Sequence, residues 1–599
     1  MPDIAYLPGT QKSPQQTELS APAFVDTDHV HFPDGRLTTI PPYAVTSFMD
    51  DYVEILGGLR SIFATKLTGT YVGTYYFFAT HDRLLVMKNN GLYNMTPLVA
   101  TKTATLGTDP LAVVDTDATL TVSYTAHGLA VGDRIKLSGA TDTGGITAAT
   151  YINKELIVAT VPDANSITVE LGDEATSTTS GGGSSVDIFK QITAGNYSQG
   201  AAVGYGVGEY GEGIYGQGGP AVTAQFFPRI WSFDNFGNEV AMCPGDYTAG
   251  DGQKIYIWDG DTETAPTVLT NAPTDCNWIT VVNNHIVALC GNRVDVCENG
   301  DGTVWSGATT YSKTLERVWK AVACYKFGEK EAVIFTPQEA ILLRYIGDAS
   351  GTLWDLSDLY TEDGIIAPMS ACLVNTVLRW HGARGFYSYD GGPVKREENS
   401  QNEEWILKNI NYGQAWKSFA MRDQSDNQAW FYFPVGEDTE PGNYVIHNPP
   451  NNPNGGHWTL GEMIRTAAQR PGFLDGAFFM GKAVGSASEA AIYRHFTTGA
   501  VTFDWYATSS DSYNGDGKNR MQVDRIMPDS NQDGDITLTI YGKEYAQKSA
   551  NTFGSYTITA TTEFITPKAF GRLLAMKWAG SVAFTMGAWK IDVSELGET

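Results

Sequence analysis

The strongest constraint on the fold is a weak internal repeat between residues 226 and 497. Segments such as "RIWSFDNFGNEVAM", "NWITVVNNHIVALCGNRVDVCENG" and "AVACYKFGEKEAVIFTPQEAILLRYIG" each contain short apolar runs separated by Gly, Asp or Asn turns. Their spacing is roughly 40–50 residues, which is the length of one four-stranded propeller blade. Runs such as "AVIFT" and "AWFYF" are apolar on both faces, as expected for strands packed between neighbouring blades. The sequence therefore predicts an all-β chain built on an irregular β-propeller.

The repeat begins before residue 226 and is interrupted. Residues 46–110 contain "TYYFFATHDRLLVMKNNGLYNMTP", which has the shape of a first blade and brings the predicted total to six or seven. Residues 111–190 then alternate polar and apolar positions between turns and end in "ATSTTSGGGSS", a flexible boundary tract. We expect this segment to be an inserted small β-barrel or β-sandwich domain. His127 has no second ligand at metal-binding spacing, so we interpret it as a turn histidine.

The two ends of the chain differ from the repeat. Residues 1–45 are rich in Pro, Thr, Gln and Asp and predict an extended N-terminal strap over the folded body. Residues 498–599 contain longer alternating runs and predict a C-terminal β-sandwich domain. Helical patterning is scarce, with short candidates only at 313–326 and 401–417.

Residues 191–225 contain the tract "GYGVGEYGEGIYGQGG", in which Tyr205, Tyr210 and Tyr215 recur every five residues. The letters G-x-G-x-x-G occur here, but no helix follows them, so a dinucleotide site is excluded. A plain linker would favour serine over tyrosine, whereas tyrosine provides rigid contact area at protein interfaces. We therefore expect a projecting loop or hairpin whose three tyrosines contact a partner, with a plain linker as the alternative.

Composition limits the functional classes. Lys+Arg 40 against Asp+Glu 67 gives a formal net charge of -27, which disfavours stable binding to a phosphate backbone. The six cysteines include no C-x-x-C pair and have strand-like neighbours, so we expect buried free thiols. Neither a secretion signal nor a membrane segment is expected, which indicates synthesis in the cytoplasm.

One acidic segment near the C-terminus has the spacing of a calcium loop. Asp529, Asn531, Asp533 and Asp535 occupy positions 1, 3, 5 and 7 of the D-x-[DN]-x-[DN]-G pattern, with Gly534 at position 6. Position 12 is Ile540, so the bidentate glutamate is missing, and the flanks predict strands rather than helices. An acidic hairpin turn is the favoured interpretation, and weak Ca²⁺ binding is the alternative; no other cofactor is expected.

No catalytic motif is present. The sequence lacks G-x-S-x-G, H-E-x-x-H and G-x-x-x-x-G-K-[ST], and no Ser or Cys stands in a motif that ties it to His and Asp. A pair of glycosidase carboxylates remains an alternative. The 67 acidic residues offer many pairs, and the sequence does not show which of them lie close together. We assign no catalytic residue and expect a protein that is not an enzyme.

Four features together resemble a known family: the strap with "VHFPDGRLTTIPPY", the "HGLAVGDRIKLSG" module inside a propeller, the Tyr-Gly tract, and the terminal "RLLAMKWAGSVAFTMGAWKIDVSELG". The chain resembles the tail nozzle, or packaged-DNA stabilisation, proteins of short-tailed bacteriophages. The resemblance implies a structural virion protein that forms a homo-hexameric ring beneath an adaptor ring. It also implies contacts with tail fibres or a needle, and a tube that retains and then ejects the genome.

An acidic chain suits such a tube, because a wall without basic groups does not hold the sliding duplex. The main alternative is a polysaccharide-binding or depolymerising phage tail protein. A second is a β-propeller enzyme, such as a glycosidase or lactonase, with a carboxylate or calcium at its axis.

Overall fold

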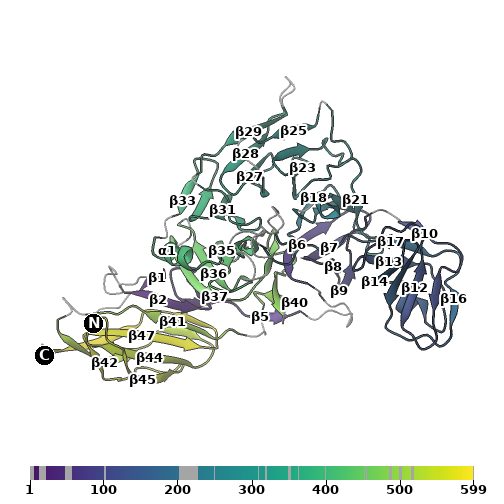
Figure 1. Cartoon of the computed structure of the whole chain (residues 1–599). Coiled ribbons are helices and arrows are strands. Elements are labelled where there is room, and N and C mark those ends of the chain that lie inside the picture. Colours follow the sequence, from purple (N-terminus) through teal and green to yellow (C-terminus); the bar gives the residue numbers. More distant parts are fainter. Residues whose placement is uncertain are drawn as a thin grey trace, which may run out of the picture.

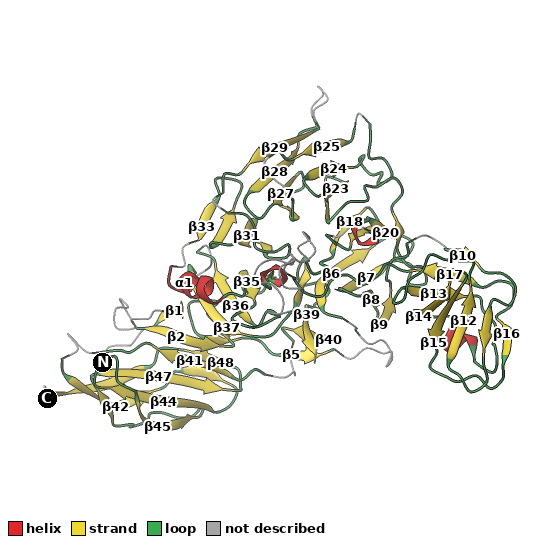
Figure 2. Ribbon diagram, viewed as in Figure 1, coloured by secondary structure: helices red, strands yellow, loops and turns green. Residues whose placement is uncertain are grey.

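The fold is given by a computed structural model (Figures 1 and 2), and nearly all of its regular structure is β-strand. In the described part, the one α-helix is α1 (Ser400–Asn409), with short helical turns at Ala148–Ile152, Asp251–Gln253 and Ala415–Lys417. The predicted all-β class is therefore confirmed. The structure describes residues 6–12, 22–46, 55, 57–99, 103–200, 227–247, 250–307, 309–316, 320–347, 353–361, 363–397, 400–450, 452, 455–484, 489–497, 502–513 and 518–597.

Seven four-stranded antiparallel units form a ring, as in a β-propeller (Figure 1). In each unit the first strand named below is the inner one. The units are blade 1, β6 (Leu59–Leu67), β7 (Gly73–Thr80), β8 (Leu84–Lys88) and β9 (Gly91–Asn94); blade 2, β18 (Ser232–Phe236), β19 (Glu239–Cys243), β20 (Tyr256–Trp258) and β21 (Thr267–Val268); blade 3, β22 (Trp278–Val282), β23 (His285–Cys290), β24 (Arg293–Val296) and β25 (Tyr311–Thr314); blade 4, β26 (Ala323–Lys326), β27 (Glu331–Phe335), β28 (Ala340–Tyr345) and β29 (Trp354–Asp358); blade 5, β30 (Ala371–Val374), β31 (Val377–His381), β32 (Phe386–Tyr389) and β33 (Lys395–Glu397); blade 6, β34 (Phe419–Asp423), β35 (Gln428–Phe433), β36 (Asn443–Asn448) and β37 (His457–Glu462); and blade 7, β38 (Ala467–Arg470), β39 (Phe479–Val484), β40 (Glu489–His495) and β5 (Tyr43–Val45).

The ring is closed by segments far apart in sequence. Strand β5, from the N-terminal region, is the outer strand of blade 7 and pairs antiparallel with β40, placing Tyr43 opposite His495. The inner strands of blades 7 and 1 pair in parallel, with Gln469 opposite Ile62. The N-terminal strand β5 therefore completes blade 7, and the pairing of β38 with β6 joins blade 7 to blade 1.

Neighbouring blades are joined through buried tryptophans at the start of inner strands. The Trp231 indole of blade 2 donates a hydrogen bond to the Thr80 carbonyl of blade 1 at 2.9 Å. The Trp278 indole of blade 3 donates to the Cys324 carbonyl of blade 4, also at 2.9 Å. Strands such as β23 and β35 are buried along their whole length, because each blade is covered on both faces.

The inserted domain lies between blades 1 and 2 of the chain and projects from one side of the ring (Figure 1). It has its own hydrophobic core, which includes Leu120, Ile135 and Val169. Its eight strands, in spatial order, are β10 (Ala104–Thr105), β17 (Asp187–Lys190), β13 (Arg134–Ser138), β14 (Glu155–Asp163), β15 (Ser166–Glu170), β12 (Thr119–Ser123), β11 (Leu111–Val113) and β16 (Thr179–Gly181).

A third unit combines both ends of the chain and lies on the opposite side of the ring from the inserted domain (Figure 1). Strand β2 pairs with β41, and β4 pairs with β48, so the N-terminal strap supplies strands to the C-terminal sandwich. Its sheets are β1 (Leu7–Thr10), β2 (Ala23–Asp28), β41 (Trp505–Ser509), β47 (Leu573–Gly580), β44 (Ile536–Lys543) and β45 (Asn551–Ile558); β3 (Val30–His31), β4 (Thr38–Thr39), β48 (Phe584–Met586) and β43 (Ser530–Gln532); and β46 (Ala569–Gly571), β42 (Arg520–Met527) and β49 (Lys590–Gly597).

The strap also contacts the propeller. Strands β1, β2 and β3 lie against β37 of blade 6. The Thr27 hydroxyl donates to the Leu460 carbonyl at 2.7 Å, and the Asn448 side chain donates to the Phe32 carbonyl at 3.0 Å. The strap is therefore packed between the sandwich and blade 6.

The helix predicted over 313–326 is wrong. Its two ends belong to strands β25 and β26, and Ala323 pairs with Phe335 of β27. Packing between blades outweighs the helical pattern of this short segment. The candidate over 401–417 overlaps α1, which ends at Asn409, and the six cysteines are free and buried, as predicted. Among the described residues, no helix is long and apolar enough to cross a membrane.

Candidate functional site

A cavity lies at the centre of the propeller. It has a volume of about 530 Å³, and the inner strands of all seven blades contribute to its wall. Its aromatic lining includes Phe63, Phe233, Trp278 and Tyr325. We call this cavity the axial pocket. Its size is that of a pocket for a small molecule.

The charged groups of the axial pocket are Asp234, Lys326, Glu329, Arg422 and Arg470. Burial raises the pKa of Asp234, and backbone hydrogen bonds and Lys326 oppose that rise. The Asp234 carboxylate accepts hydrogen bonds from the Val281 backbone N–H at 2.7 Å and from the Thr280 hydroxyl at 3.1 Å. This carboxylate therefore joins blade 2 to blade 3.

Arg470 also joins blades across the pocket. Its guanidinium donates to the Met369 and Ala371 carbonyls at the start of blade 5, and lies 4.7 Å from the ring of Tyr325 in blade 4. The thiols of Cys324 and Cys372 also line the pocket, and burial raises the pKa of both. Protonated thiols are poor nucleophiles, so neither cysteine is placed as a catalytic nucleophile.

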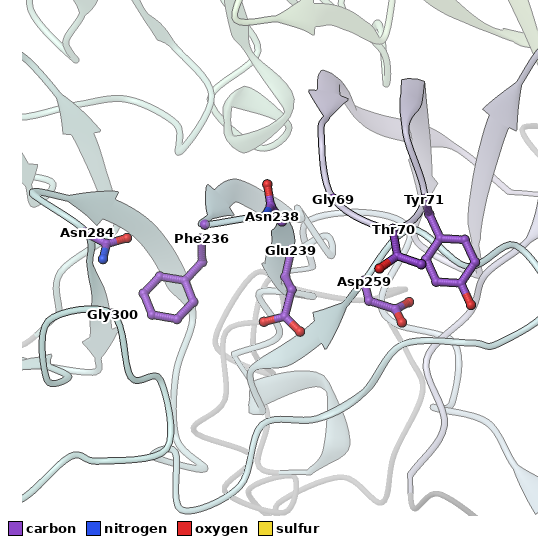
Figure 3. A pocket seen from close by; sticks show the side chains of 10 residues that line it. Gly69, Thr70, Tyr71, Phe236, Asn238, Glu239, Asp259, Asn284 and Gly300 are labelled. Atoms are coloured by element: carbon purple, nitrogen blue, oxygen red, sulfur yellow. The ribbon is translucent and has the colours of Figure 1, made fainter.

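A second hollow, of about 460 Å³, lies at the turns that join the inner strands of blades 1 and 2 to their neighbours. Figure 3 shows the side chains of Glu239 and Asp259 beside each other between Phe236 and Tyr71. Burial raises the pKa of Glu239, and the neighbouring Asp259 raises it further. Thr68 donates to the Asn238 side chain at 3.0 Å and holds the two turns together.

The predicted calcium loop forms part of a sheet. Asn531 lies in β43 opposite Thr585, and the Asp529 carboxylate accepts a hydrogen bond from the Ala588 backbone N–H at 2.8 Å. Asp533 and Asp535 follow in the turn to β44. The carboxylates of Asp529, Asp533 and Asp535 are not among the described groups of three whose oxygens lie within 4.8 Å of one another.

Tyr205, Tyr210 and Tyr215 lie outside the described residues, but both flanks of their tract are described. The Gln199 side chain accepts a hydrogen bond from the Trp416 backbone N–H at 3.2 Å, and the Phe227 ring is centred 4.2 Å from the Trp416 ring. Residue 416 therefore contacts the chain both before and after the tract. His127, the predicted turn histidine, is buried and accepts a hydrogen bond from the Leu129 backbone N–H at 2.9 Å.

Sequence reasoning missed a buried charge cluster next to Trp416. Glu440 accepts hydrogen bonds from Arg60 at 2.8 Å, from Lys417 at 2.9 Å and from the Tyr197 hydroxyl. These residues come from blade 1, from the segment before the tract and from blade 6. A separation of up to 380 residues gives no local sequence signal, so only the folded structure reveals the cluster.

Comparisons with known proteins assign no family. No family model matches the chain, and no curated protein matches it. Among solved structures, the computationally designed Ika8 protein shares 10% identity over 76% of this chain and 99% of its own, with a TM-score of 0.32. The phage phi92 endosialidase shares 12% identity over 76% of this chain and 61% of its own, with a TM-score of 0.17. The ancestral GH74 enzyme AFV00434 shares 11% identity over 46% of this chain and 35% of its own, with a TM-score of 0.27. Likenesses this low carry no argument about activity.

Proposed function

We propose that this chain is a structural subunit of the tail of a short-tailed bacteriophage, and that a ring of six chains forms the nozzle through which the genome is retained and ejected. The observation that carries the proposal is the architecture: a propeller closed by an N-terminal strand, with one β domain projecting on each side. This arrangement agrees with the family resemblance of the sequence. Two projecting domains on opposite sides give each subunit separate surfaces for a neighbour, an adaptor ring and a fibre or needle.

The propeller axis itself is not the proposed DNA channel. Its cavity of about 530 Å³ is lined by apolar and charged side chains of all seven blades, and Arg470 donates a hydrogen bond across it to the Met369 carbonyl of the segment before β30. A cavity of this size holds a small molecule, and a duplex cannot pass through it. The channel must therefore form between subunits, which makes the ring a requirement of the proposed function.

The charge of the chain supports the same proposal. A net charge of -27 per subunit disfavours tight contact with phosphates, because binding to DNA depends on basic groups that displace its counterions. In the proposed tail the protein is part of the virion, after synthesis in the cytoplasm of the host bacterium.

A second candidate is a polysaccharide-binding or depolymerising tail protein. The aromatic wall of the axial pocket favours it, because Phe63, Phe233, Trp278 and Tyr325 offer ring faces to a ligand. The two proposals predict different assemblies and different chemistry.

Native mass spectrometry and negative-stain imaging of the purified chain, over a range of concentrations and with a phage adaptor protein added, separate them. We expect rings of six subunits and no release of reducing ends from capsular polysaccharides. A chain that stays monomeric with the adaptor present and cleaves a polysaccharide would contradict the nozzle proposal.

A further inference from the structure

A cluster of possible metal ligands lies where the strap meets blade 6. His31 comes from β3 of the strap, Asp423 from the end of β34, and Asp426 from the turn between β34 and β35. One ligand atom from each lies within 4.8 Å of the others. Groups this close can share one ion after small shifts of their side chains.

Asp423 is the unusual member of the cluster. Its side chain is fully buried, its Oδ1 accepts a hydrogen bond from the Ser425 backbone N–H at 2.9 Å, and its Oδ2 has no hydrogen-bond partner. The Nε2 of Gln428, its partner across the hairpin, is also buried without a partner. Buried polar atoms are nearly always paired, and an exception indicates an ion or a water molecule.

The surrounding charges increase the need for a cation. Asp423 is buried, and the Asp426 carboxylate lies beside it, with one oxygen of each within 4.8 Å. His31 lies with its Nδ1 3.3 Å from the Gln428 Oε1 and 3.6 Å from the Asp426 Oδ2.

We propose that His31, Asp423 and Asp426 bind one divalent cation, Zn²⁺ or Mn²⁺, with the Gln428 amide oxygen beside the ion. An imidazole with two carboxylates suits these ions better than Ca²⁺ or Mg²⁺, which prefer ligand sets made of oxygen alone. The ion offsets the charge of both carboxylates and gives the Asp423 Oδ2 a partner.

The position of the site gives the cation a structural role. His31 pairs with Thr38 of β4, and β4 pairs with β48 of the sandwich, whereas both aspartates belong to the propeller. A bound ion therefore fastens the strap, and through it the C-terminal sandwich, to blade 6. The inference does not depend on the proposed tail function.

The test uses the full chain after dialysis against EDTA, with isothermal titration calorimetry of ZnCl₂, MnCl₂, CaCl₂ and MgCl₂. We expect one equivalent of Zn²⁺ or Mn²⁺ per chain, and at least tenfold weaker binding in Asp423→Asn and in His31→Gln. Asp529→Asn, in the predicted calcium loop, is the matched control and should bind as the wild type does.

Limited proteolysis tests whether the ion fastens the strap to blade 6. Arg36 is exposed on the strap, so trypsin cleavage at Arg36 should speed up when EDTA removes the ion from the wild type. Asp423→Asn should be cleaved at one rate with and without EDTA. Absence of zinc and manganese binding in the wild type, or wild-type affinity in both Asp423→Asn and His31→Gln, would overturn the proposal, as would loss of binding in Asp529→Asn alone.

Discussion

Glu440 is the residue on which the buried charge cluster depends. Its carboxylate lies between Arg60 and Lys417, whose side chains are 1% and 0% exposed. Lys417 is otherwise satisfied, since its ammonium donates to the Thr439 carbonyl at 2.7 Å and to the Ser198 hydroxyl at 3.1 Å. The cluster thus fixes the segment that leads to the Tyr-Gly tract against blades 1 and 6.

Glu440→Gln should lower the free energy of unfolding by about 3–5 kcal/mol, because it leaves two buried cations without a counter-ion. Glu404→Gln is the control, since the Glu404–Lys408 pair on α1 is exposed and contributes about 0.5 kcal/mol or less. Guanidinium denaturation at pH 7 measures both values. Equal effects of the two substitutions would show that the buried cluster contributes no more to stability than an exposed ion pair.

The same carboxylate predicts a dependence of stability on pH. Burial would raise the pKa of Glu440, but the Arg60 and Lys417 charges outweigh it and lower the pKa to about 2 from 4.5. A lowered carboxyl pKa stabilises the fold above pH 4.5, and the stabilisation is lost as the pH falls toward 2. We expect about 3 kcal/mol of acid-sensitive stability in the wild type that Glu440→Gln lacks. Denaturation at pH 5 and pH 3 should show about 2 kcal/mol of this loss in the wild type beyond the change in Glu440→Gln, and an equal change in both proteins would contradict it.

Among the elements of the fold, those with a local sequence pattern could be predicted from the sequence. The blade period, the inserted domain and the long C-terminal strands were all visible as patterns of alternation and turns, because those patterns are local. The closing strand β5 was not visible, since three residues at Tyr43–Val45 carry no periodicity and pair with a strand about 450 residues away. The His31–Asp423–Asp426 cluster was missed for the same reason.

Tyr43 should be the main contribution of β5 to ring closure. Its ring is centred 4.9 Å from Phe503 and 5.2 Å from Tyr493, and the Arg465 guanidinium lies 5.3 Å from it. Tyr43→Ala should lower the free energy of unfolding by about 2 kcal/mol, because it removes these contacts of β5 with blade 7 and Phe503. Tyr545→Ala, at a ring that is 57% exposed, should change stability by less than about 0.5 kcal/mol. Thermal denaturation compares the two variants. An unchanged melting temperature in Tyr43→Ala would show that Tyr43 does not hold β5 on blade 7.

The inserted domain should be removable as a unit. Thr105 lies opposite Asp187 in paired strands, so the chain enters and leaves the domain at one place. Replacing residues 106–186 by Asn-Gly should close a two-residue hairpin there and leave the propeller intact. The variant exposes the blade 1 groups that Arg134 and Glu155 contact, and we expect a shift of about 3 °C or less in its melting temperature. Calorimetry of this variant and of the fragment 103–191 measures both units, and an unfolded propeller would contradict their independence.

For the whole molecule, the net charge predicts a low affinity for duplex DNA, as the wall of a DNA channel requires. Proteins that bind duplex DNA non-specifically do so at about 10⁻⁴–10⁻⁶ M through basic groups that displace counterions. With 67 acidic and 40 basic residues, this chain should bind a 30-base-pair duplex more weakly than about 10⁻⁴ M at 150 mM salt. Fluorescence anisotropy from 50 to 300 mM salt measures this affinity for the single chain and for any ring it forms.

The affinity of the assembled ring for DNA tests whether the genome slides through the proposed channel without being held. In the proposed ring, acidic groups that face the channel would repel the duplex, so affinity for DNA should not rise when rings form. A ring that retards the duplex with a steep salt dependence would place basic groups in the channel and contradict passage by repulsion. A ring that leaves the duplex free supports a wall past which the genome slides, because no phosphate contact has to be broken as each base pair advances.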